Sequence, residues 1–191
     1  MSRTPLIITL GLALGLSTLA HAETVTDAQL AEARGLVKAF GGTLKKELQA
    51  ALKAGGPEKG VEVCAVKAPQ IASDLSTQSG WELGRTSLKT RNQGNQPDSW
   101  ERAVLQAFES RKADGQAPGT LEYAEIVNHD GAQELRYMKA IPTAAVCLNC
   151  HGADEVKPTT AAAIANYHPD DMARGYQEGD LRGAFSFRKS L

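Results

Sequence analysis

The sequence has no excess of charge of either sign. Its 191 residues include 21 Lys and Arg against 22 Asp and Glu, which gives a formal net charge of -1 at pH 7. No block of like charges interrupts this balance. A nucleic-acid-binding surface needs basic side chains clustered on one face. DNA and RNA are therefore not expected as partners.

Long apolar runs are also missing, except at the amino terminus. Residues 6–19 are almost continuously apolar, and they lie between Arg3 and the small-residue pattern Ala20-His21-Ala22. This order is typical of a secretory signal peptide that is cleaved after Ala22. The run is shorter than the roughly 20 residues that span a bilayer, and no later run approaches that length. We expect residues 1–22 to be removed on export to the periplasm, with no membrane contact afterwards.

The sequence has no internal repeat and no low-complexity tract, so residues 23–191 are expected to form one domain. Helical patterns come first. Apolar residues recur at helical spacing behind the capping box Thr26-x-x-Gln29, which predicts a long amphipathic helix that Gly55-Gly56-Pro57 ends. A second helix is expected to begin at Pro57, to turn Cys64 inward and to be interrupted at Pro69.

Strand patterns dominate the later part of the chain. Strands are expected at residues 81–87, 121–128, 134–141 and 183–189, and helices at 100–111 and 159–167. Asp130-Gly131 predicts a hairpin between the second and third strands. Helices followed by strands favour an α+β fold with a mainly antiparallel sheet. The large rings of Trp81, Tyr123 and Tyr137 are expected in its core.

Cysteine is scarce, and two of the three cysteines form the motif Cys147-Leu148-Asn149-Cys150-His151. Two thiols at this spacing can add to the two vinyl groups of haem, and the adjacent imidazole then lies over the iron. A thioredoxin-type pair would need a βαβ pattern, and a zinc site would need a second pair of ligands; the sequence has neither. The single motif predicts one haem c, attached at Cys147 and Cys150 and ligated by His151.

The residues alone leave the second axial ligand open. The candidates are the methionines, histidines and cysteine that remain after cleavage: Met138, Met172, His129, His168 and Cys64. The usual ligands of haem c favour Met138 or Met172. An unpaired thiol in an oxidising compartment favours Cys64, but a small buried hydrophobic side chain would explain that residue equally well.

Several separated motifs occur in a specific order over the whole mature chain: Cys64 with Ala68-Pro69 and Ile71-Ala72; Gly84-Arg85-Thr86-Ser87 with Arg91-Asn92, Asn95 and Pro97-Asp98; Cys147 to Gly152; and Gly175-Tyr176 with Gly179-Asp180 and Arg182-Gly183-Ala184. In these motifs the chain resembles a family of exported c-type haem proteins of uncharacterised function with a PAS-like fold. The resemblance implies a PAS-like antiparallel sheet flanked by helices, with the haem in the pocket of the sheet. Its iron ligands, carried over to this sequence, are His151 and Cys64.

Three cations are candidates for binding the haem propionates. Arg85 and Arg91 can each form paired hydrogen bonds to a carboxylate, and Lys139 is the third candidate.

Imidazole and thiolate together fill both axial positions, and a thiolate lowers the reduction potential. We therefore expect a low-potential electron carrier or redox sensor rather than an enzyme. No kinase or other output segment is recognised in the sequence, so an unidentified redox or signalling protein is the expected partner. The alternatives are a diatomic gas sensor, in which the gas displaces the Cys64 sulfur, and a haem enzyme of sulfur or peroxide chemistry.

Overall fold

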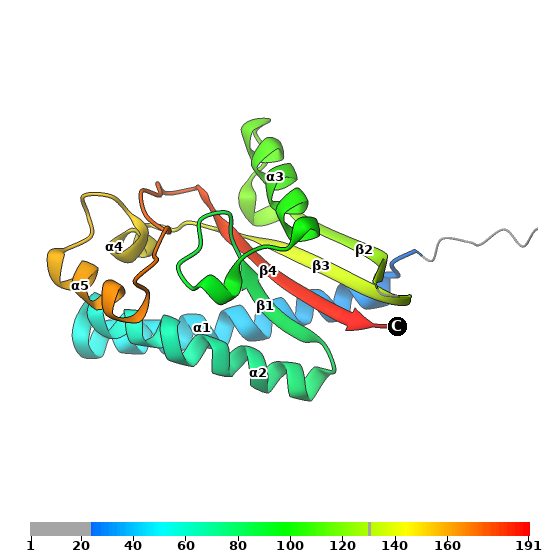
Figure 1. Cartoon of the computed structure of the whole chain (residues 1–191), viewed down its shortest axis with the longest axis horizontal. Helices are drawn as coiled ribbons and strands as arrows, with labels where there is room; N and C mark the ends of the chain where they lie inside the picture. The colour runs from blue at the N-terminus through cyan, green and yellow to red at the C-terminus, as the bar shows by residue number, and fades with distance from the viewer. Residues whose placement is uncertain (1–23, 130) are drawn as a thin grey trace, which may run out of the picture.

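The computed structural model describes residues 24–129 and 131–191, so the expected signal peptide lies outside the described residues. In chain order the helices and strands are α1 (Asp27–Glu62), α2 (Ala68–Ser79), β1 (Glu82–Thr86), α3 (Ser99–Ala113), β2 (Glu122–His129), β3 (Ala132–Pro142), α4 (Leu148–His151), α5 (Pro158–Tyr167) and β4 (Leu181–Ser190) (Figure 1). The four strands pair antiparallel in the order β1-β4-β3-β2. The expected α+β fold, an antiparallel sheet flanked by helices with a long N-terminal helix, is confirmed.

The sheet carries helices on both faces, with α1 and α2 on one side and α3 on the other (Figure 1). Successive residues of β3 point to opposite faces. Tyr137 packs in the cluster that includes Phe40 of α1, whereas Met138 packs in the cluster that includes Phe108 of α3. Trp81 and Tyr137 are buried as expected. The expectation for Tyr123 is wrong: it lies on the edge strand β2 and is 43% exposed.

The start of α1 and the break within it follow the sequence pattern. The Thr26 hydroxyl accepts the backbone N–H of Gln29, and the Gln29 side chain accepts the backbone N–H of Thr26, as a capping box requires. Gly55 and Gly56 leave the helical region, with φ at Gly56 at 71°, a conformation that favours glycine. Helical geometry resumes at Pro57.

Pro69 does not interrupt the helical path, which corrects the expectation from the sequence. Residues Val63–Lys67 form a π-helical turn in which the N–H of Ala68 donates to the carbonyl of Val63, and α2 continues through Pro69. The wider turn accommodates a proline, which has no N–H for the carbonyl four residues earlier. Cys64 lies in this turn, a type of element that is frequent at functional sites.

The motif of Cys147, Cys150 and His151 lies at one end of the molecule with α4 and α5, which follow β3 and precede β4 in the chain (Figure 1). The expected hairpin of β2 and β3 delivers the chain to this end. Thr143 then bonds to the segment that precedes β4, since its N–H donates to Asp180 and its carbonyl accepts from Gly179. Among the described residues, no helix combines the length and the apolarity needed to cross a membrane.

Candidate functional site

Two consecutive tight turns carry the motif cysteines. Ala145–Cys147 forms a 3₁₀ turn, and the four residues of α4 follow it. The spacing of three residues directs Cys147 and Cys150 to the same side. Both are half-buried free thiols, as is Cys64. Burial raises the pKa of the Cys150 thiol; Arg91 opposes this shift and Cys64 adds to it, which places Cys64 near the motif.

His151 is held in one orientation and one protonation state. Its Nδ1 lies 2.9 Å from the carbonyl oxygen of Ala173, and because a carbonyl only accepts, Nδ1 carries the proton. Its backbone carbonyl accepts from Tyr176, whose ring meets the imidazole edge-on at 6.1 Å. Burial, followed by the charges of Arg182 and Arg91, holds the pKa of His151 well below its usual range. The imidazole is therefore neutral, with its lone pair on Nε2, the form that ligates metals.

Arg182, which the sequence analysis did not nominate, faces that lone pair. Its Nε lies 3.4 Å from Nε2 of His151, and its Nη1 donates to the Ser87 hydroxyl at 3.2 Å. The guanidinium also lies 5.3 Å from the centre of the Tyr176 ring. The next residue is Gly183, where a Cβ would come within 2.3 Å of the Thr86 carbonyl oxygen. The available signal in the sequence was the motif Arg182-Gly183-Ala184, one of those that carry the family resemblance.

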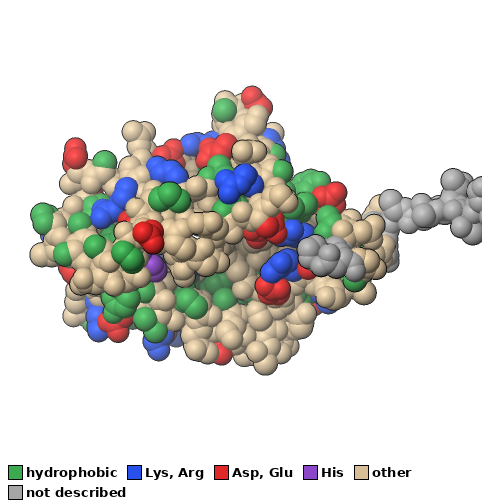
Figure 2. Space-filling view, viewed as in Figure 1, with side chains coloured by type: hydrophobic (Ala, Val, Ile, Leu, Met, Phe, Trp, Pro, Cys, Tyr) green, Lys and Arg blue, Asp and Glu red, His purple; other side chains and the backbone are tan. Residues whose placement is uncertain are grey.

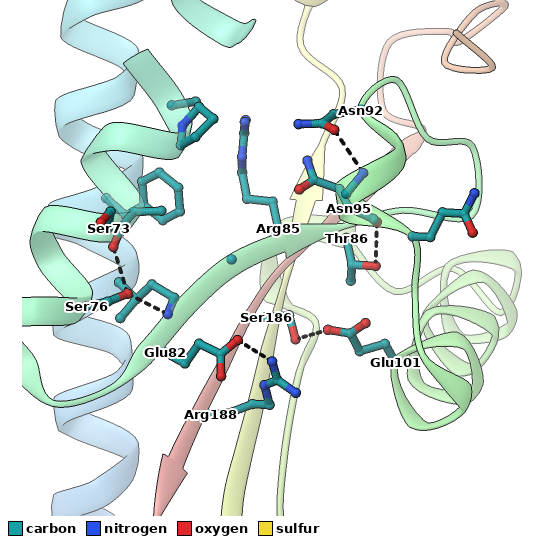
Figure 3. A pocket seen from close by; sticks show the side chains of 18 of the residues that line it. Ser73, Ser76, Glu82, Arg85, Thr86, Asn92, Asn95, Glu101, Ser186 and Arg188 are labelled. Carbon is teal, nitrogen blue, oxygen red and sulfur yellow. Dashed lines mark hydrogen bonds and ion pairs between the residues drawn. The ribbon is translucent and has the colours of Figure 1, made fainter. Parts of the chain in front are cut away.

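Cys64 borders a cavity of about 510 Å³ between α2, β1 and the segment after β1. Figure 2 shows a hollow near the centre of this face, and Figure 3 shows the side chains that line the cavity. Phe40 and Arg85 also line it, with the Arg85 guanidinium 5.8 Å from the centre of the Phe40 ring. Burial lowers the pKa of Arg85, and the nearby Cys64 opposes this shift. The cavity thus brings together two of the predicted site residues, Cys64 and Arg85.

Arg91 makes its contacts with the protein itself. Its side chain is 8% exposed and pairs with the 9% exposed Asp171, with Nε 3.0 Å from Oδ1. Its Nη2 donates to the carbonyl oxygens of Cys150, at 2.5 Å, and of Ala173, at 3.1 Å. Arg91 therefore lies beside the motif and joins it to the segment that orients His151.

The remaining candidates lie elsewhere. Met138 is fully buried in the core on the α3 side, Met172 is 51% exposed, and His168 is half-buried. Lys139 lies 4.0 Å from the Glu122 carboxylate. The side chain of His129 lies outside what the structure describes. Among the candidate second ligands with described side chains, only Cys64 lines the cavity.

The described residues supply the donor groups that a haem c would use: the free thiols of Cys147 and Cys150, the neutral imidazole of His151 and the thiol of Cys64. Cys64 lines the cavity, whose volume is within the size range of cofactor pockets, whereas Cys147, Cys150 and His151 are not among its lining residues. In the described part of the chain, neither Arg85 nor Arg182 has a nearby carboxylate acting on its pKa. Half-buried cations of this kind suit the two acidic propionates of haem.

Comparison with known proteins gives one family and one fold. A family model described as Tll0287-like matches residues 16–190. The chain is similar to the crystal structure of the cyanobacterial heme-protein Tll0287, with 22% sequence identity and a TM-score of 0.64 over 87% of this chain and 98% of that chain. None of the curated proteins compared matches the chain. At this identity, the structural likeness shows a shared fold.

Proposed function

This chain belongs to the Tll0287-like family, and we propose that it is a periplasmic mono-haem c-type cytochrome that acts as a low-potential electron carrier or redox sensor. One observation carries the proposal: the neutral imidazole of His151 is fixed through Nδ1 directly after the two free thiols of Cys147 and Cys150. The structurally similar cyanobacterial protein is described as a heme-protein, which supports the same cofactor here.

Each residue of the site has a distinct task in this proposal. Cys147 and Cys150 hold the cofactor through thioethers, since each thiol adds its sulfur and its proton across a vinyl double bond. His151 and Cys64 would ligate the iron, and the Ala173 carbonyl fixes the tautomer that leaves Nε2 of His151 as the donor atom. When bound, haem c supplies one-electron redox chemistry at its iron, and a thiolate ligand lowers the potential of that iron.

Arg85 and Arg182 are the cations that we assign to the propionates. Both guanidinium groups are half-buried, and burial lowers the pKa of each. A propionate would give each of them the carboxylate partner that a desolvated cation needs. Arg91 is assigned a different task, because its donors already meet Asp171 and two backbone carbonyls.

The cavity beside Cys64 favours a second candidate function, the sensing of a diatomic gas. Both axial positions are filled in our proposal, so a gas can bind only if one protein ligand leaves. Cys64 is the better leaving ligand, because this residue lines the cavity and His151 is held by its own hydrogen bond.

Absorption spectra of the purified protein, oxidised and reduced, with and without carbon monoxide, test the proposal. An electron carrier should be six-coordinate and low-spin in both states and should not react with carbon monoxide. A gas sensor should form a carbonyl adduct on reduction. His151→Ala should keep the covalent haem but become high-spin, because the thioethers do not depend on the iron bond. An unchanged low-spin spectrum in this variant would remove His151 from the ligand set.

A further inference from the structure

Arg91 and His151 share one hydrogen-bond acceptor, the backbone carbonyl oxygen of Ala173. Nδ1 of His151 lies 2.9 Å from this oxygen, and Nη2 of Arg91 lies 3.1 Å from it. A carbonyl oxygen has two lone pairs, so it can accept both donors at once. The Nδ1 proton of His151 therefore binds a carbonyl oxygen that also accepts from the Arg91 cation, which makes this oxygen a weaker acceptor.

The position of the Arg91 guanidinium is fixed on several sides. Asp171 accepts from its Nε at 3.0 Å and from its Nη2 at 3.3 Å, and both side chains are less than a tenth exposed. Asp171 in turn accepts the backbone N–H of Ala173 at 2.9 Å and Nε of Arg174 at 3.0 Å. The cation, the carboxylate and the shared carbonyl thus form one closed network on the side of His151 that faces away from Nε2.

We propose that Arg91 is a positioning residue that raises the reduction potential of the haem through the Ala173 carbonyl. The inference rests on the proposed function, because it requires His151 to be an iron ligand. A strong acceptor at Nδ1 makes the imidazole a more basic ligand, which stabilises ferric iron. Arg91 weakens that acceptor and so disfavours the ferric state. Its positive charge adds to this effect only in part, because the Asp171 carboxylate lies 3.0 Å from it.

The test compares Arg91→Gln with Arg174→Gln in the holoprotein. Arg174 binds the same Asp171 carboxylate at 3.0 Å, but the described contacts include no bond from its side chain to the Ala173 carbonyl. The measurements are the reduction potential, by spectroelectrochemical titration, and the shift of the His151 Nδ1 proton in the ferric NMR spectrum. We expect Arg91→Gln to raise the ratio of ferric to ferrous protein about tenfold at a fixed potential, which is about 59 mV for one electron. Arg174→Gln should change the potential less and leave the Nδ1 proton in place.

Equal shifts of the potential in the two variants, or an unmoved Nδ1 proton in Arg91→Gln, would overturn the inference. If Arg91→Gln does not mature, Arg91→Lys decides the question. A lysine keeps the positive charge but not the planar guanidinium. The potential of Arg91→Lys should therefore lie below that of the wild type, by less than the roughly 59 mV expected for complete loss of Arg91. A wild-type potential in Arg91→Lys together with an unmoved proton would count against the inference. Failure of the proposed function looks different, because the wild type itself would then lack covalent haem or a His151 ligand.

Discussion

The guanidinium of Arg182 and the imidazole of His151 face each other, with Nε 3.4 Å from Nε2. We assign Nε2 as the nitrogen that binds the iron. Its lone pair cannot accept the hydrogen bond from Arg182 and bind the iron at the same time. An iron bond at Nε2 would leave Arg182 to take another acceptor nearby. A haem propionate is the acceptor that this cation can reach in our account.

Replacing Arg182 should therefore lower the reduction potential. Arg182→Gln removes a half-buried positive charge that disfavours ferric iron and should raise the ratio of ferric to ferrous protein roughly tenfold, or about 59 mV for one electron. Lys89→Gln is the matched control, because Lys89 is an exposed cation 4.5 Å from the centre of the same Tyr176 ring. Solvent screens that charge, so its removal should have little effect. Identical potentials for the wild type and Arg182→Gln would contradict the assignment.

Asp171 should make the stability of the protein sensitive to acid. Although burial would raise its pKa, the hydrogen bond from Arg91 and the N–H of Ala173 hold the pKa of Asp171 below its usual value. Its contribution is present above the unfolded pKa of about 3.9 and is lost as the pH falls through the lower folded value. At neutral pH, Asp171→Asn should cost about 3–5 kcal/mol, because Arg91 is left buried without its partner.

Urea unfolding between neutral pH and pH 2.5 checks this prediction. Asp171→Asn should lose less stability than the wild type over the acid range, whereas Asp154→Asn, at an exposed position, should follow the wild type. Parallel pH profiles for the wild type and Asp171→Asn would show that the Asp171 network does not determine the acid sensitivity.

Met138 should prove to be a core residue and not an iron ligand. It is fully buried among the apolar side chains of the α3 side. Met138→Ala should lower the free energy of unfolding by about 2–5 kcal/mol and leave the low-spin spectrum of the folded holoprotein unchanged. Loss of an axial-ligand signature in that variant would restore Met138 as a ligand candidate.

The sequence predicts what depends on local patterns. The break at Gly55-Gly56, the hairpin of β2 and β3 and the antiparallel sheet all follow from local spacing, and all are present. Local patterns do not show strand order, so the exposure of Tyr123 on an edge strand was missed. The continued helix at Pro69 was missed because a π-helical turn leaves no recognised signal in the sequence.

The sequence predicts the motif of Cys147, Cys150 and His151, but it does not predict the contacts that Arg91 and Arg182 make. Cys147, Cys150 and His151 lie within five residues of one another, so their spacing alone predicts haem attachment. The tasks of Arg91 and Arg182 depend on contacts with residues tens of positions away, at Cys150, Ala173 and His151. One sequence shows the residue type at such positions but not the partner. The sequence alone therefore indicates a propionate for Arg91, whereas the structure shows Arg91 bonded to the carbonyl oxygens of Cys150 and Ala173.

Cys64 should supply the thiolate signature of the oxidised protein. A ferric iron stabilises a coordinated sulfur anion, so the bond should persist at neutral pH, and reduction should weaken it. Cys64→Ser and Cys64→Ala should lose the thiolate-ligated low-spin signals in electron paramagnetic resonance and near-infrared absorption. Met172→Leu, at a residue that is 51% exposed, should retain them. Unchanged thiolate signals in both Cys64 variants would return the choice to Met138, Met172, His129 or His168.

The mass of the intact protein after acid-acetone extraction tests the central claim most directly. The extraction removes haem that is not covalently bound, so only thioether attachment at Cys147 and Cys150 can keep the cofactor on the chain. Expressed with residues 1–22 in a host with working cytochrome c maturation, the protein should have the mass of the chain from Glu23 plus one haem. The mass of the bare chain from Glu23 would contradict the account.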